Sequence, residues 1–274
     1  MSESTAIRAS QVPPPLDLRA GETEKFDELS AMTRALLDIL RGDAPTRAGD
    51  MAMVAHEALD RSIAHNPPPQ KPACAKGCGF CCRVYVSASA PEVFALMRAM
   101  RGLPPEHFAR MRERVRAAAR AVTAHWSGNY AVTQQCPILE DNACALYAAR
   151  PDPCRGVSSY SARSCEISMA ALSEGRDEPV PQVQEHGILR ALHTHTFWAA
   201  LKAAKLPYAT YSLNHALDRA LDTNDAEARW LAGEDVFAGV QQDTSLTGRN
   251  LQMVEATMDV LIGGATGTLE APAV

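Results

Sequence analysis

The sequence has little of several features that identify common protein classes. Aromatic residues make up only 5% of its 274 positions, and the net charge is −5. Nucleic-acid-binding proteins need basic surfaces and often stack bases on aromatic rings, so this composition argues against a nucleic-acid partner. The chain also has no Walker loop, no glycine-rich dinucleotide fingerprint and no serine–histidine–aspartate pattern. No common reaction class is therefore indicated by a motif.

Long apolar runs are missing as well. The first 15 residues are polar and proline-rich and lack the apolar core of a secretory signal. No uninterrupted apolar stretch approaches the ~20 residues that cross a bilayer. We therefore expect a cytoplasmic protein with no membrane partner. Thiols are kept reduced in that compartment, where clustered cysteines usually bind metals or catalyse reactions rather than form disulfides.

Cysteine, in contrast, is concentrated in one part of the chain. Packed thiolates repel one another unless a cation, a cluster or disulfides hold them together. Spacings of two or three residues allow two thiolates from one turn to reach a single metal at ~2.3 Å. The sequence therefore predicts metal ligation by all eight cysteines, which are Cys74, Cys78, Cys81, Cys82, Cys136, Cys144, Cys154 and Cys165.

The residues within the first cysteine group fit this chemistry. Gly77 and Gly79 allow the positive φ angles that a chain needs when it folds back toward a metal. Cys81 and Cys82 are adjacent, so their side chains diverge unless the backbone bends. They would more naturally serve two metals, or two atoms of one cluster.

Basic residues near the cysteines offer counter-charge. Four thiolates on a divalent ion leave a negative centre, which is costly to bury without compensation. Lys76, Arg83, Arg150 and Arg155 all lie next to cysteines. We favour the electrostatic role for Arg150 and Arg155, which flank Cys154.

Histidine gives a weaker signal than cysteine. His186 and His193 lie seven residues apart on one predicted helix, but buried or surface histidines are commoner than metal ligands. The other histidines, His56 included, form no pattern. A set made only of cysteine argues against magnesium, calcium or a non-haem iron oxygenase, which prefer oxygen or imidazole ligands.

Zinc and an iron–sulfur cluster both remain open at this point. Zinc closes with four ligands, so two zinc sites would use all eight cysteines. A 4Fe-4S cluster takes four cysteines and leaves the others for structure, redox chemistry or a second metal. We favour the iron–sulfur cluster slightly over zinc.

The order of these motifs resembles one known family. Cys74-x3-Cys78-x2-Cys81-Cys82 is followed by Cys136-Pro-x-Leu, Cys144-x-Leu-Tyr and Arg150-Pro-x2-Cys154-Arg155. Over about residues 74–156 the chain resembles the YkgJ-type cysteine-cluster family, whose members are described as zinc- or iron-chelating. The resemblance implies metal binding by the seven motif cysteines, and Cys165 lies outside the core motif.

The resemblance leaves the reaction undefined. Flagellin lysine methylase, a distant relative, carries a similar cluster and is associated with iron–sulfur chemistry, which implies that an enzyme is compatible with the motif. The Cys74-x3-Cys78-x2-Cys81 spacing is also that of radical S-adenosylmethionine enzymes. Those enzymes need alternating strands and helices after the motif, and the downstream sequence shows none.

Periodicity predicts a mainly α fold, with a helical body around an irregular cysteine-rich metal-binding core and little strand. Helical spacing of apolar residues predicts two helices between residues 24 and 66, and others near 89–101, 105–126, 166–172, 183–205, 212–221, 224–232 and 250–262. One short strand is predicted at 84–86. The expected segments are a disordered lead-in (1–22), N-terminal helices (23–66), the cysteine-cluster region (67–165), a C-terminal helical region (166–262) and a disordered tail (263–274).

Three functional hypotheses follow. The first is a cytosolic protein that binds an iron–sulfur cluster or zinc. The second is a cluster-dependent enzyme that transfers methyl groups or electrons to a protein substrate. The third is a metal carrier or interaction module, with the C-terminal helices as the surface for a protein partner. The sequence identifies no catalytic residue.

Overall fold

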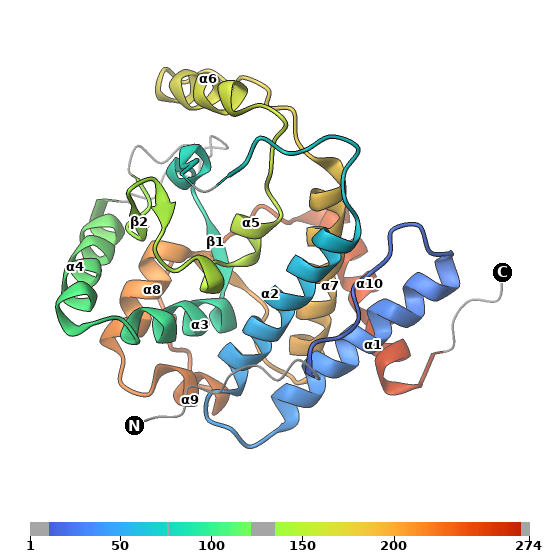
Figure 1. The fold of residues 1–274 in the computed structure, drawn as a ribbon. Coiled ribbons are helices and arrows are strands. Elements are labelled where there is room, and N and C mark those ends of the chain that lie inside the picture. Colours follow the sequence, from blue (N-terminus) through green and yellow to red (C-terminus); the bar gives the residue numbers. More distant parts are fainter. Residues whose placement is uncertain (1–10, 76, 122–134, 270–274) are drawn as a thin grey trace.

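Helices form most of residues 11–75, 77–121 and 135–269, which are the residues that the computed structural model describes (Figure 1). The mainly α prediction is confirmed. The helices are α1 (Glu22–Arg41), α2 (Arg47–His65), α3 (Ala90–Arg101), α4 (Pro105–Ala121), α5 (Asp152–Arg155), α6 (Ala162–Ser173), α7 (Gln184–Ala203), α8 (Leu213–Asp222), α9 (Ala226–Leu231) and α10 (Gly248–Thr266). None of these described helices is long and apolar enough to cross a membrane. The predicted extension of α4 to residue 126 lies outside the described residues.

The named strands of the described residues form two small antiparallel pairs. One pair joins β1 (Ser87–Ser89) to β4 (Thr210–Ser212), and the other joins β2 (Leu139–Glu140) to β3 (Ala143–Cys144). Two short 3-10 helices, η2 (Phe80–Arg83) and η3 (Tyr147–Ala149), lie in the cysteine region. The strand that we predicted at 84–86 is displaced to 87–89, because β4 pairs with that segment.

α2 lies between two groups of helices. It contacts α1 and α7 on one side and α3 on the other. α1, α7 and α10 pack together, as do α3 and α8 with α4 beside α8 (Figure 1). The cysteine segments η2, β2, β3 and α5 lie together above this helical body in the same view. The body thus presents the cysteines at one end.

The helix boundaries follow ordinary capping chemistry. α3 begins with a capping box, in which the Ser89 N–H donates to Glu92 Oε2 at 2.8 Å. After α9 the chain turns at Gly233, which has a left-handed conformation with a φ of 90°. A cluster of aromatic rings fills the core beside α3: Phe94 lies 5.7 Å from both Trp230 and Phe237, measured between ring centroids.

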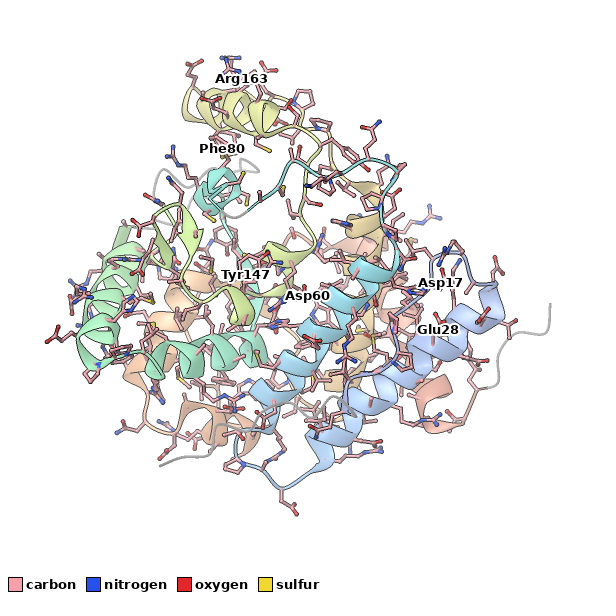
Figure 2. All side chains as sticks on the ribbon, viewed as in Figure 1. Asp17, Glu28, Asp60, Phe80, Tyr147 and Arg163 are labelled. Atoms are coloured by element: carbon pink, nitrogen blue, oxygen red, sulfur yellow. The ribbon has the colours of Figure 1, made fainter. Side chains whose placement is uncertain are left out.

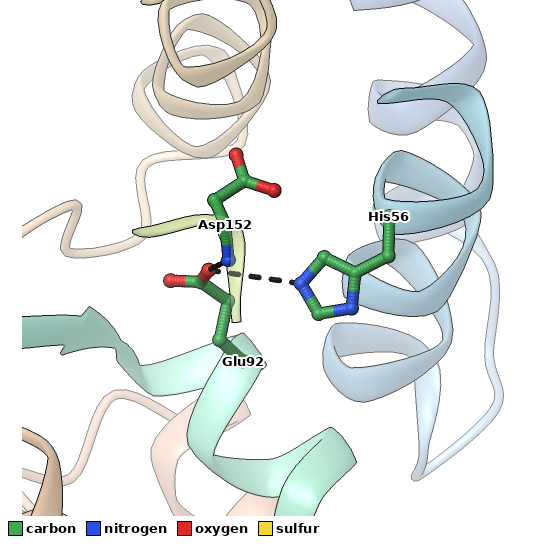
Figure 3. A group of neighbouring side chains, drawn as sticks. All are labelled: His56, Glu92 and Asp152. Atoms are coloured by element: carbon green, nitrogen blue, oxygen red, sulfur yellow. Dashed lines mark hydrogen bonds and ion pairs between the residues drawn. The ribbon is translucent and has the colours of Figure 1, made fainter. Parts of the chain in front are cut away.

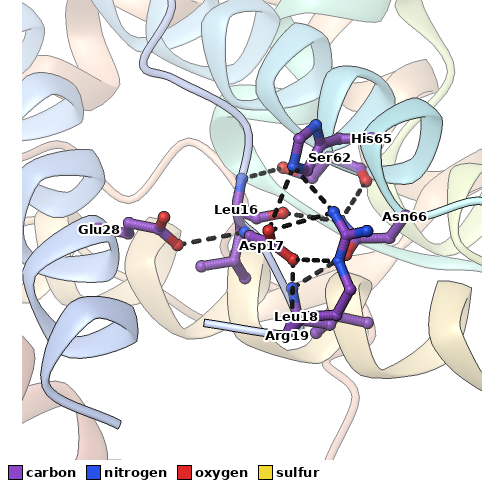
Figure 4. Close-up of polar contacts among 8 residues, drawn as sticks. All are labelled: Leu16, Asp17, Leu18, Arg19, Glu28, Ser62, His65 and Asn66. Atoms are coloured by element: carbon purple, nitrogen blue, oxygen red, sulfur yellow. Dashed lines mark hydrogen bonds and ion pairs between the residues drawn. The ribbon is translucent and has the colours of Figure 1, made fainter. Parts of the chain in front are cut away.

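The segment before α1 is fixed against α2, contrary to the predicted disorder over 1–22 (Figure 4). The Leu16 N–H donates to Ser62 Oγ at 2.9 Å, and the Leu18 N–H donates to Asn66 Oδ1 at 2.9 Å. Leu16 is completely buried. The disordered lead-in therefore ends earlier than predicted. Ser62 of α2 and Asn66, which caps the C-terminus of α2, form hydrogen bonds with the backbone of this segment. Residues 1–10 lie outside the described residues.

The predicted disordered tail also begins too early. α10 continues through Gly263 and Gly264 to Thr266, and both glycines are buried. A Cβ at Gly264 would lie 2.2 Å from Ser30 Oγ, so only glycine allows this close approach to α1. Arg34 donates to the Ala265 carbonyl at 2.7 Å and fixes the end of the helix. Residues 270–274 lie outside the described residues.

His193 gives the fold a defined sensitivity to acid. Its side chain is 1% exposed, its Nε2 lies 2.9 Å from Ser62 Oγ, and burial lowers its pKa to about 4. The unfolded chain binds a proton near pH 6.5 and the folded chain does not, so stability falls as the pH decreases from about 6.5 to about 4. For His193→Gln we expect the loss of unfolding free energy between pH 7 and pH 5 to be about 2 kcal/mol smaller than in wild type.

Urea unfolding at the two pH values measures this difference. His65→Gln, which changes an exposed histidine of the same protein, is the matched control and should keep the wild-type pH dependence. Parallel pH profiles for wild type and His193→Gln would contradict the assignment.

Candidate metal centre

A small hairpin positions the second cysteine group. β2 and β3 are joined by Asp141 and Asn142, whose φ angles of 47° and 58° suit the two central residues of a type I′ turn. Arg114 of α4 donates to the Pro137 carbonyl at 2.7 Å and to the Leu139 carbonyl at 3.2 Å. The hairpin that carries Cys144 is therefore held on α4. The predicted irregular core therefore contains a regular hairpin at this point.

The first cysteine group turns through η2. Gly77 has the predicted positive φ, 93°, whereas Gly79 has a φ of −109°. Gly79 is instead required by close packing, because a Cβ there would lie 3.1 Å from Leu139 Cδ2. The 3-10 turn supplies the backbone bend that the adjacent cysteines need, and the Cys82 thiol is hydrogen-bonded to Cys81. The two side chains therefore stay together.

The two cysteine groups meet in space. The Cys136 N–H donates to the Cys82 carbonyl at 2.7 Å, which joins the groups through their main chains. Six cysteines line one cavity of about 590 Å³. The six, drawn from both groups, are Cys78, Cys81, Cys82, Cys136, Cys144 and Cys154.

Cys74 and Cys165 are not among the residues that line this cavity, but both lie beside the first group. The Ser159 N–H donates to Cys74 Sγ at 3.3 Å. Burial raises the pKa of the Cys74 thiol, and the Cys165 thiol is among the neighbours that raise it further. Cys165 is carried by α6, which contacts η2. The structure thus brings Cys165 to the cysteine region although it lies outside the core motif.

The electrostatics of the cavity wall reflect crowded thiols. Burial raises the pKa of Cys154 well above the ordinary value, and the thiols of Cys136, Cys81 and Cys144 add to the shift. Cys81 differs, because the hydrogen bond from Cys82 lowers its pKa to about 6. At neutral pH the wall therefore holds the readily ionised thiol of Cys81 beside those of Cys82, Cys136, Cys144 and Cys154, whose pKa values are raised.

Arg150 supplies positive charge at this wall, as predicted. Its charge helps to lower the pKa of Cys81 and opposes the upward shift of Cys154. The guanidinium lies 4.0 Å from the centroid of the Tyr147 ring and 4.0 Å from an Asp60 carboxylate oxygen. Figure 2 shows Tyr147 and Asp60 near each other below η2. Arg150 is thus held between an aromatic ring and a carboxylate while it faces the thiols.

Arg155 has both an electrostatic and a structural role. Its charge, like that of Arg150, opposes the upward shift in the pKa of the Cys144 thiol. Its side chain is 2% exposed and is paired with Asp60. It also donates to the Arg150 carbonyl at 2.8 Å and to the Ala148 carbonyl. These bonds fix the segment that carries Cys154. Of the other predicted basic residues, Arg83 is exposed and Lys76 lies outside the described residues.

The two histidines weighed in the sequence do not line the cavity. His186 Nδ1 lies 2.5 Å from Ser158 Oγ, and His193 contacts Ser62. Sequence analysis missed His56, which is buried beside Glu92 and Asp152. Its position among Ala52, Ala55 and Leu59 on the buried face of α2 was the available signal.

The donor set fits a thiolate-bound metal. All eight cysteines are free, and six of them face a common space. Among the described residues, no three thiol sulfurs lie within 4.8 Å of one another. Around a single zinc ion, bonds of ~2.3 Å place sulfurs roughly 4 Å apart. The thiols therefore surround a space wider than one closed zinc tetrahedron.

Comparison with known proteins gives one match. Residues 73–171 match the model of the CxxCxxCC family, which has the description "Putative zinc- or iron-chelating domain". The matched segment contains all eight cysteines, Glu92 and Asp152, and excludes α1, α2 and α7 to α10. Comparisons with curated proteins and with solved structures gave no match. The match agrees with the resemblance inferred from the motif: residues 73–171 are similar to this zinc- or iron-chelating cysteine-cluster domain.

Proposed function

We propose that this protein binds an iron–sulfur cluster through thiolates of the cavity wall. The observation that carries the proposal is the convergence of six free thiols, from two separate segments, on one cavity of about 590 Å³. Thiolates are the characteristic ligands of iron–sulfur clusters. A bound cluster would supply one-electron transfer or a reactive iron at this wall.

The spacing of the thiols favours a cluster over a single zinc ion. The ligands of a cluster bind different iron atoms, so their sulfurs stand farther apart than those around one ion. The described thiols have such an open arrangement, with no three sulfurs within 4.8 Å of one another. We take the six cysteines that line the cavity as the first candidates for ligands. The thiols of Cys81, Cys136 and Cys144 act electrostatically on Cys154, and those of Cys81, Cys136 and Cys154 act on Cys82.

As an alternative, the eight thiols can form two centres of four, one of which would take Cys74, Cys78, Cys81 and Cys165. Cys74 lies in the electrostatic neighbourhood of Cys78, Cys81 and Cys165. Four thiolates satisfy one zinc ion, or they can complete a larger cluster. Arg150 offsets part of the negative charge that either centre would bring. This division also keeps zinc as the alternative metal, with two sites of four thiolates each.

A second candidate function is a cluster-dependent enzyme. A cavity of about 590 Å³ is far larger than a metal ion needs and lies in the range of small-molecule sites. Beyond the thiols it is lined by polar groups that include Gln182, Arg190 and Asn214. These groups give an organic substrate both room and hydrogen-bonding partners beside the metal. A carrier that passes its metal to a protein partner is the third alternative.

The proposal places the protein in the reducing cytoplasm. The eight free cysteines support this, since none of them is paired in a disulfide. Thiol titration after metal removal, on protein taken anaerobically from cells, checks the compartment independently of the metal. Three or four disulfide bridges would contradict it.

Anaerobic purification with an optical spectrum and metal analysis tests the metal assignment. We expect a brown protein with broad absorbance near ~400 nm, bound iron and a matching amount of labile sulfide. Colourless protein with two zinc ions and no sulfide would replace the cluster by zinc. Protein that keeps neither metal would contradict metal binding by these thiols.

A further inference from the structure

A second group of potential ligands lies outside the thiol wall. His56 of α2, Glu92 of α3 and Asp152 of α5 are neighbours in the interior; the His56 ring faces the Glu92 carboxylate, and Asp152 lies beside them (Figure 3). One donor atom of each lies within 4.8 Å of the other two. Their side chains belong to residues that are only 1%, 6% and 8% exposed. Three separate helices therefore meet at a buried set of one imidazole and two carboxyl groups.

Polar atoms of this group lack hydrogen-bond partners. His56 has none for either ring nitrogen, and Asp152 Oδ1 also has none. Buried polar atoms are nearly always paired in native proteins, so these atoms need an explanation. Within the group, Glu92 Oε1 forms an ion pair with His56 Nε2 and accepts from the Asp152 N–H, which leaves His56 Nε2 and Asp152 Oδ1 without a hydrogen bond.

The distance between two of these groups fits a shared ion. His56 Nε2 lies 3.6 Å from Glu92 Oε1, which is too long for a hydrogen bond. It is shorter than twice the ~2.1 Å bond that a divalent metal makes to nitrogen or oxygen. One ion between the two atoms can therefore reach both, and a carboxyl oxygen of Asp152 lies within 4.8 Å of them.

Glu92 is already held in the orientation of a ligand. Its Oε2 accepts from the Ser89 N–H at 2.8 Å and from the Ser89 hydroxyl at 2.7 Å. Its Oε1, which faces His56, accepts from the Asp152 N–H at 2.8 Å. Outer hydrogen bonds of this kind orient metal ligands in known sites.

We propose that His56, Glu92 and Asp152 form a second metal site, separate from the thiol wall, for a divalent first-row ion such as Mn²⁺ or Fe²⁺. Imidazole together with carboxylates suits these ions, whereas thiolates select softer metals. The three ligands leave further coordination positions for water or another small group.

The group lies beside the thiol cavity. Arg155 and Arg190 act on Asp152, and Arg155 pairs with Asp60. Pro151 and Pro153, which flank Asp152, both line the thiol cavity. The two groups of potential ligands are therefore held on neighbouring segments of the chain.

Titration with Mn²⁺, followed by electron paramagnetic resonance, tests the site in the full-length protein with its thiol-bound metal in place. Mn²⁺ is a suitable probe because thiolates bind it poorly. We expect wild type to bind one Mn²⁺ per chain and His56→Gln to bind it at least about 100-fold more weakly. His193→Gln, which changes another buried histidine, should bind like wild type. Asp152→Asn provides a second, nearly isosteric ligand variant if His56→Gln folds poorly.

Circular dichroism and the content of thiol-bound metal verify that each variant is folded. Wild type that binds no Mn²⁺, or ligand variants that bind it as tightly as wild type, would overturn the proposal. Cys78→Ser separates the two centres, because it should lose thiol-bound metal and keep its Mn²⁺ site. The experiment can therefore contradict the second metal site without contradicting the thiol centre, and it can contradict the thiol centre without contradicting the second site.

Discussion

Cys78→Ser is expected to lose most of its thiol-bound metal. Cys78 lines the cavity next to Gly77, whose positive φ turns the chain at this point. Serine keeps the size of the side chain but removes a soft, strong metal ligand. Metal binding supplies folding energy to loops that have little regular structure, so the effect should spread beyond residue 78.

Limited proteolysis with metal analysis measures this effect. We expect Cys78→Ser to be cut early around residues 67–90 and 130–165, whereas α1, α2 and α7 should resist longer because each has its own buried face. Cys165→Ser is the matched control, since its thiol is not among those that line the cavity, and its loss of metal should be milder. Equal metal content in Cys78→Ser and wild type would show that this thiol is not a ligand.

Arg155→Met should lower the unfolding free energy by about 2–4 kcal/mol. The guanidinium is almost completely buried and pairs with Asp60, which is 41% exposed. Because Asp60 keeps access to water, the loss of its partner destabilises the protein less than the loss of a partner by a fully buried carboxylate would. The Ala148 and Arg150 carbonyls also lose donors, and they lie in the segment that leads to Cys154.

Urea unfolding of the metal-free protein separates this effect from metal loss. Arg163→Met is the matched control, because the Arg163 side chain is 74% exposed and pairs only with Glu166 three residues away. We expect the control to stay within about 0.5 kcal/mol of wild type. A similar small change for Arg155→Met would mean that the Cys154 segment does not depend on this arginine.

Local pattern was sufficient for most of the fold. Apolar residues at helical spacing predicted α1 to α4 and α7 to α10, since each of these helices buries one continuous face. The positive φ of Gly77 was predicted from a single residue, because its chemistry is local. The cysteine spacing likewise predicted a shared site, because short spacings bring two thiols within reach of one metal.

The remaining features depend on contacts between distant segments. Whether Leu16 is ordered depends on Ser62 and Asn66, and whether Gly264 is helical depends on its fit against Ser30. The position of α5 beside Glu92 depends on a hydrogen bond between residues sixty positions apart. Neither helical period nor cysteine spacing contains this information, so the boundaries at both ends and the His56 cluster were not predicted.

The position of α2 affects how the cysteine domain can be used as a unit. Its Asp60 pairs with Arg155, and its His56 faces Glu92 and Asp152. All three partners lie within residues 73–171, whereas α2 precedes that segment. If residues 73–171 were grafted onto another protein, the buried side chains of Arg155, Glu92 and Asp152 would lose the helix that contacts them in this structure. The boundary of the family segment is not the boundary of a portable module, and any graft would have to begin before residue 56.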